Sequence, residues 1–184
     1  RGRIKGASSQ LLSSTYIETG LELLKQNQSI SVLGGCGFPL CEDVPERWFY
    51  DYSGIYATGI QSTKSGFLPP TMTLYGAGCF FSKSALLDLK TLGFKFLLSG
   101  RKGGDLCTGE DRELCYALTL LGYKLYYSSE LRFDHFITKR RLTKNYRDKM
   151  LAGAIIASPI LTGYHVRVIN KYKRGAKYES DWKY

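Results

Sequence analysis

The sequence lacks the residue patterns that mark several protein classes. Its 184 residues include five cysteines, an odd number, and no two of them are spaced as Cys-x-x-Cys. A disulfide framework or a structural zinc site is therefore not expected, and a reducing cytoplasm is the better setting. No apolar run approaches the roughly 20 residues that a membrane-spanning helix needs, and no signal peptide is visible.

The composition that remains favours a globular domain with basic ends. Hydrophobic residues make up 43% of the chain, which is enough for a core. The net charge of +10 is uneven, because residues 139–184 hold twelve Lys/Arg and three Asp/Glu. Such ends attract phosphate in nucleic acid, lipid headgroups or nucleotides. A solvated tail is the simpler explanation for residues 165–184.

Apolar periodicity predicts a helix near the start of the chain. Within residues 13–27, Ile17, Leu21 and Leu24 fall on one helical face. A Ser or Thr among residues 13–15 is expected to cap this helix.

A long irregular region follows a short strand predicted at residues 29–35. Prolines break up residues 36–70, which we expect to cross the surface with short strands near Gly54–Ile60. An apolar strand is then predicted to enter the turn Gly76-Ala77-Gly78. Small residues between a strand and a helix let another group approach the backbone, although a plain tight turn is the alternative. Ser82 or Ser84 is expected to cap the next helix.

Two adjacent carboxylates follow a glycine-rich polar loop. Glu110 and Asp111 open a predicted helix, and Thr108 precedes Asp111 at the spacing of a capping box. A structural role at the helix dipole is therefore available to them. A carboxylate held at this position can also act as a general base.

The helices and the strand predicted after Asp111 are consistent with an α/β fold. The helix after the carboxylates carries the apolar stripe Leu114, Ala117, Leu118 and Leu121. Gly122 is expected to end it, and a short strand then leads to His135. A last helix is predicted to be polar first, apolar later and broken near Pro159. Strands that alternate with helices predict an α/β fold.

Four motifs, taken as a set, resemble the second half of an inverting family 2 glycosyltransferase with the GT-A fold. They are the turn Gly76-Ala77-Gly78, "GED" at 109–111, "LGYKLYY" at 121–127 and His135. The resemblance covers roughly residues 11–145. It implies a partial GT-A mixed sheet with flanking helices over residues 1–145. Residues 146–184 would then be a helical, basic C-terminal extension.

The resemblance also implies roles for particular residues. Asp111 matches the general base that deprotonates the acceptor hydroxyl, with Glu110 beside it. His135 matches a position that can bind the divalent metal, Mn²⁺ or Mg²⁺. The implied substrate-binding residues are Gly76, Ala77, Gly78, Gly109, Arg101, Lys102 and Arg141. Their partners would be a nucleotide-sugar donor and a glycan or lipid-linked acceptor.

One departure from the family limits what the chain is expected to do alone. Residues 7–10 stand where the Asp-rich metal motif is expected, and no DxD occurs in the chain. The nucleotide-binding half is therefore expected to be missing, and the chain alone is expected to be inactive. We expect a cytoplasmic location at or near the inner membrane face, with peripheral membrane contact through the basic ends and possible homo-oligomers.

Other readings of the sequence stay open. The chain could be a non-catalytic fragment that binds a glycan or a partner. A zinc site at Cys107, Cys115 and His135 is conceivable, although the spacing is unusual. Nucleic-acid binding is not expected, because no recognised motif accompanies the basic charge.

Overall fold

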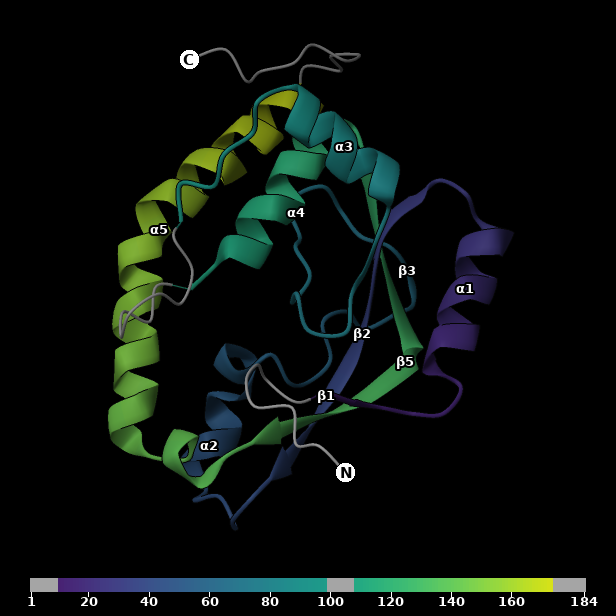
Figure 1. The fold of residues 1–184 in the computed structure, drawn as a ribbon. Helices are drawn as coiled ribbons and strands as arrows, with labels where there is room; N and C mark the ends of the chain where they lie inside the picture. Colours follow the sequence, from purple (N-terminus) through teal and green to yellow (C-terminus); the bar gives the residue numbers. More distant parts are fainter. Residues whose placement is uncertain (1–9, 99–107, 174–184) are drawn as a thin grey trace.

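The computed structural model describes residues 10–98 and 108–173, which form a sheet flanked by helices (Figure 1). The helices are α1 (Tyr16–Gln26), α2 (Trp48–Asp51), α3 (Lys83–Thr91), α4 (Glu110–Leu120) and α5 (Lys144–Lys173), with the 3-10 helices η1 (Ser53–Tyr56) and η2 (Lys139–Arg141). The strands are β1 (Gln10–Leu12), β2 (Ile30–Cys41), β3 (Gly66–Phe67), β4 (Phe80–Phe81) and β5 (Lys124–Ile137).

The five strands form one mixed sheet in the order β1-β5-β2-β4, and β3 also pairs with β5. The two long strands, β2 and β5, run parallel, and the other pairings are antiparallel. The chain between β2 and β5 contains α3 and α4, as a parallel crossover requires. The predicted α/β class with a mixed sheet and flanking helices is therefore confirmed.

Glycines in β2 let other backbone segments approach this strand closely. A Cβ on Gly35 would lie 2.1 Å from the carbonyl oxygen of Leu131 in β5. A Cβ on Gly37 would lie 2.8 Å from the carbonyl oxygen of Ala57. The register between β2 and β5 also shifts next to Gly35, so the bulge and the close approach occur together.

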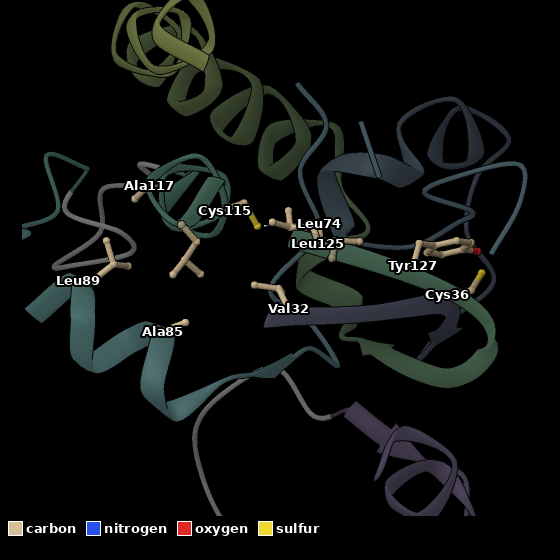
Figure 2. Packing of buried hydrophobic residues seen from close by; sticks show 10 residues of the cluster. Val32, Cys36, Leu74, Ala85, Leu89, Cys115, Ala117, Leu125 and Tyr127 are labelled. Carbon is tan, nitrogen blue, oxygen red and sulfur yellow. Dashed lines mark hydrogen bonds between the residues drawn. The ribbon is translucent and has the colours of Figure 1, made fainter. Parts of the chain in front are cut away.

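The main core lies between the long strands and the helices α3 and α4 (Figure 2). Its buried members are Val32, Cys36, Leu74, Ala85, Leu89, Cys115, Ala117, Leu118, Leu125 and Tyr127. The apolar stripe predicted on α4 is confirmed, because Leu114 and Leu121 pack against this cluster beside the buried Ala117 and Leu118. Ser82 caps α3 as expected, accepting the N–H of Ala85 at 3.4 Å.

Helix α1 docks through an aromatic ring and a glycine; of the predicted aliphatic face, Leu24 packs against the core, whereas Ile17 and Leu21 do not. Tyr16 and Gly20 are buried, whereas Ile17 and Leu21 are 51% and 46% exposed. The Tyr16 ring stacks on Phe80, and a Cβ on Gly20 would overlap the Phe80 ring. The prediction for Ile17 and Leu21 was wrong because this stacking sets the rotation of the helix.

The segment between β2 and β4 contains short helices where short strands were predicted. Residues 48–51 form α2 and residues 53–56 form η1, so Gly54–Ile60 contain most of η1 and an isolated bridge at Gly59 in place of strands. The apolar residues just before Gly76 are not a strand either. Both predictions were wrong: near residues 48–56 the buried side chains of Phe49 and Tyr56 pack in a separate aromatic cluster on short helical turns, and the pairing in this segment is limited to β3 and the Gly59 bridge.

A buried carboxylate joins α4 to two other parts of the chain. The Glu113 side chain accepts the backbone N–H groups of Leu97 (2.9 Å) and Leu98 (3.0 Å). It also accepts the hydroxyl of Tyr164 in α5 at 3.1 Å. Glu113 is completely buried. Because an unpaired buried donor or acceptor is costly, these bonds hold the three segments together.

Helix α5 is continuous, although a break was predicted near Pro159. Pro159 lies on the exposed side, so the carbonyl that loses its N–H partner there is open to water. At its other end, Lys171 Nζ donates to the carbonyl of Leu120 (2.8 Å), and the Tyr172 hydroxyl donates to that of Thr119 (3.3 Å). These bonds satisfy the C-terminal end of α4.

Replacing Glu113 with Ala should lower the free energy of unfolding by about 3 kcal/mol or more, since three donors, two of them buried, lose their acceptor. Tyr164→Phe removes only one of these bonds and should cost about 1 kcal/mol. Urea unfolding followed by circular dichroism measures both. The exposed Glu130→Ala is the control, and an equal loss for Glu113→Ala and this control would contradict the bracing role.

A pair of glycine substitutions tests the close approach in the sheet. Gly35→Ala should prevent stable folding, because its Cβ would collide with the Leu131 carbonyl oxygen. Gly163→Ala meets open space on an exposed face of α5 and should stabilise by about 0.5–1 kcal/mol. Thermal unfolding of both variants is the measurement. A Gly35→Ala chain that melts like the unchanged chain would show that β2 and β5 can separate at this point.

Candidate functional site

The candidate catalytic carboxylates lie in the first turn of α4. This helix begins after Gly109, whose φ of 112° is in the left-handed region. A Cβ on Gly109 would lie 3.0 Å from Leu161 of α5, so the glycine permits both the backbone turn and the contact between the helices. Glu110, Asp111 and Glu113 share the first turn of α4, where the helix dipole favours negative charge.

The Asp111 carboxylate is bonded to the Gly76 turn. Its Oδ2 accepts the backbone N–H of Gly76 at 2.9 Å, and its Oδ1 accepts that of Arg112 at 2.8 Å. The capping box predicted for Thr108 and Asp111 was wrong, because Gly109 occupies the N-cap position and no side chain makes the capping bond. Each oxygen of Asp111 keeps a lone-pair site for a further donor.

The turn Gly76-Ala77-Gly78 connects Asp111 to one edge of the sheet. Gly78 has a φ of 67°, and its N–H donates to Oε1 of Gln10 at 3.1 Å. Gln10 stands opposite His135 in the pairing of β1 with β5. Gly76 and Gly78 are two residues apart, so their Cα atoms are at most about 7 Å from each other. The turn therefore links the Asp111 carboxylate, through Gln10, to the strand pair that carries His135.

Tyr75 and Gln61 support the same turn, and no sequence pattern pointed to Gln61. Its Oε1 accepts the N–H of Tyr75 (2.6 Å), and its Nε2 donates to the carbonyl of Gly35 (2.7 Å). Burial raises the pKa of the Tyr75 hydroxyl, and the charge of Asp111 raises it further. Tyr75 is therefore a neutral phenol near the carboxylate. In the sequence, the one indication that Tyr75 belongs to the site is that it precedes Gly76.

Two buried thiols hold the backbone that precedes the turn. Cys79 Sγ donates to the Tyr75 carbonyl at 2.8 Å. Cys115 Sγ donates to the Leu74 carbonyl at 3.7 Å, and Figure 2 shows these last two residues. Burial raises the pKa of the Cys115 thiol to about 12 and that of the Cys79 thiol well above its usual value. Both thiols are therefore protonated near neutral pH and act as donors, not as nucleophiles.

His135, the predicted metal ligand, is buried in β5 with 4% exposure. The described part of the chain contains no group of three or more His, Cys, Asp and Glu side chains that could hold a metal ion. Asp134, which precedes His135 in β5, is exposed and points to the opposite face of the strand. These residues do not fit a Mg²⁺ or Mn²⁺ site, which needs several oxygen ligands. Of the alternative zinc set, Cys107 lies outside the described residues.

Arg141 is a buried cation between two aromatic rings. Its guanidinium carbon lies 5.8 Å from the Tyr56 ring centroid and 5.5 Å from that of Tyr146. The Tyr56 hydroxyl donates to the Arg141 carbonyl at 3.0 Å, which fixes the backbone there. Within residues 10–98 and 108–173, no carboxylate forms an ion pair with Arg141. A guanidinium held in this way has free donors for a phosphate or carboxylate group.

The remaining predicted residues contribute less to this arrangement. Arg101 and Lys102 lie outside the described residues. Ala77 is half-buried and packs against the core cluster beneath α1. Glu110 is half-buried beside Asp111. The structure thus gathers Asp111, Glu110 and the glycine turn into one place.

The chain matches no protein-family model, no curated protein and no solved structure. The chemistry of the site therefore rests on its own geometry. This geometry offers a fixed carboxylate with free lone pairs beside Gly76, which has no side chain. Such a pair can accept a proton from a hydroxyl group that reaches the turn.

Two substitutions separate the hydrogen bond of Asp111 from its charge. Asp111→Asn should cost less than Asp111→Ala, because its amide oxygen still accepts the Gly76 N–H although its NH2 group cannot accept the Arg112 N–H. Asp111→Ala removes the acceptor and should cost about 1 kcal/mol. Urea titration compares them, with the exposed Asp134→Ala as the control. Equal losses for the Asn and Ala variants would mean that the charge, and not the bond, stabilises the turn.

Proposed function

We propose that the chain is the acceptor-side part of an inverting glycosyltransferase of the GT-A type. In this proposal a sugar passes from a nucleotide-diphospho-sugar donor to an acceptor hydroxyl, and Asp111 is the general base. The observation that carries the proposal is the placement of the Asp111 carboxylate against the Gly76 turn.

The surroundings of Asp111 suit this role. The carboxylate is half-buried, its orientation is set by one bond to each oxygen, and the adjacent Gly76 is exposed and has no side chain. A hydroxyl of the acceptor can therefore reach a free lone pair of the carboxylate. As the sugar carbon forms its bond to the acceptor oxygen, that oxygen gives its proton to Asp111, and the nucleoside diphosphate leaves with the electron pair of the broken bond. Glu110 would contact the acceptor from the same turn.

The departing diphosphate needs a positive counter-charge. In this proposal Arg141 supplies it, as the resemblance implies, because Arg141 is a buried guanidinium that forms no ion pair with a carboxylate among the described side chains. The resemblance also implies Mn²⁺ or Mg²⁺, but the described residues do not build that site, so no step is assigned to a metal. For the same reason we propose that the chain alone does not transfer sugar.

A second candidate function is binding without catalysis, to a glycan or to a partner protein. The burial of His135 and the lack of a metal-binding group among the described residues favour it. Under this alternative the glycine turn and its neighbours would hold a sugar whose hydroxyls pair with Asp111 and Glu110.

Asp111→Asn distinguishes the two candidates. In a longer protein that contains this sequence, transfer from the nucleotide-sugar donor should fall by about 10²–10⁴-fold, the usual contribution of a general base. Donor affinity, measured by titration calorimetry with UDP and other nucleoside diphosphates in the presence of Mn²⁺, should not change.

The exposed Asp134→Asn is the matched control and should retain full transfer. Unchanged transfer in Asp111→Asn would remove the base assignment and leave Asp111 with its structural bond to Gly76. A longer protein that binds glycan but neither binds nor hydrolyses any nucleotide sugar would support the non-catalytic candidate.

A further inference from the structure

The outer face of α5 is apolar and uncovered. Ile155 and Ile156 are 73% and 69% exposed, and Val166 is 47% exposed. Pro159 is also exposed, and its spacing from these residues places it on the same face. The opposite face of α5 packs against α4, which lies between α5 and the sheet (Figure 1). We call the exposed residues Ile155, Ile156, Pro159 and Val166 the α5 stripe.

Charge is excluded from the middle of this helix and gathered at its ends. No charged residue occurs from Met150 to Val166, a length of about 25 Å at the helical rise. Lys149 lies seven residues before Ile156, and Lys173 lies seven after Val166, so both continue the stripe.

Helix α5 as a whole is strongly basic. It carries six Lys/Arg and one acidic residue, Asp148, which pairs with Arg147.

We propose that α5 lies flat on the surface of an anionic phospholipid bilayer, with the α5 stripe in the acyl boundary and its basic ends at the phosphate groups. An apolar face bounded by basic residues is the pattern of an interfacial helix. Each basic side chain near an anionic surface adds attraction. The proposal does not depend on the glycosyltransferase assignment, since it rests on α5 alone.

The contacts of α5 with the rest of the domain favour this orientation over a spanning one. No membrane-spanning segment was expected from the sequence, but α5 is long and apolar enough to cross a membrane by length and composition. Its inner face, however, is bonded to α4 through the Tyr164 hydroxyl on Glu113 and through Lys171 Nζ on the Leu120 carbonyl. A spanning helix would have to break these bonds and leave buried groups unpaired.

Charge also argues against a second copy of the chain as the occupant. Two α5 helices paired in parallel would bring the same basic ends together. An antiparallel pair would set Lys149 of one copy near Arg167 and Lys173 of the other. Either arrangement places like charges beside each other, whereas the phosphates of a bilayer neutralise both ends.

Vesicle flotation of the whole 184-residue chain tests the proposal. The chain should float with vesicles made of equal parts phosphatidylglycerol and phosphatidylcholine, and much less with phosphatidylcholine alone. The double variant Ile155→Glu/Ile156→Glu should lower the bound fraction by about tenfold or more, because two charged groups replace apolar ones at the boundary. Lys149→Glu/Arg167→Glu should abolish the preference for the anionic vesicles.

The matched controls make the same types of substitution at exposed positions outside α5. Val44→Glu/Ile60→Glu changes two aliphatic residues that are 90% and 74% exposed, and it should float like the unchanged chain. Lys64→Glu/Lys83→Glu is the control for the charge reversal, since both residues are exposed away from α5. Circular dichroism should show that every variant keeps its helix content and thermal transition.

Three results would overturn the proposal. The first is equal flotation of the Ile155→Glu/Ile156→Glu variant and the unchanged chain. The second is equal binding to neutral and anionic vesicles. The third is a dimer, seen by sedimentation velocity without lipid, that the isoleucine variant converts to a monomer, which would identify the α5 stripe as an interface between copies. Sugar transfer is not a readout in any of these arms, so the failure of one proposal leaves the other intact.

Discussion

The buried carboxylate of Glu113 is the constraint on which the site depends. A fully buried carboxylate is stable only where donors surround it, and here the donors come from the two residues at 97–98 and from Tyr164 of α5. Because Glu113 lies in the first turn of α4, these bonds also fix the direction of that turn. Asp111 stands two residues earlier on the same turn. The position of the candidate base is therefore set by a neighbour that faces the core.

Close backbone approach supplies the other half of the site. The Gly76 turn reaches Asp111 because Gln61 ties the adjacent Tyr75 to β2, and the thiols of Cys79 and Cys115 hold the carbonyls of Tyr75 and Leu74. Polar groups that satisfy the backbone thus shape the turn, while Gly76 itself is exposed and has no side chain. This division suits a base that must remain fixed while its partner changes.

The sequence predicted the elements better than it predicted their contacts. The α4 stripe, the Ser82 cap and the end of α4 near Gly122 follow from local rules, and the structure has each of them. The rotation of α1 did not follow, because Tyr16 stacks on Phe80, a residue 64 positions away. The capping box failed for a similar reason, since a distant N–H, that of Gly76, competes successfully for the Asp111 carboxylate. Rules based on residue spacing describe only residues that are close along the chain, and they do not include contacts between distant segments.

Helix α4 takes part in both proposals. Its first turn carries Asp111, and its outer side packs along α5 through the cluster that includes Leu161 and Tyr164. A bilayer beneath the α5 stripe would therefore lie one helix layer beyond α4, on the side away from the sheet (Figure 1). Helix diameters with side chains are about 10–12 Å. If both proposals hold, an acceptor hydroxyl bound at Asp111 would lie about one helix layer from the bilayer.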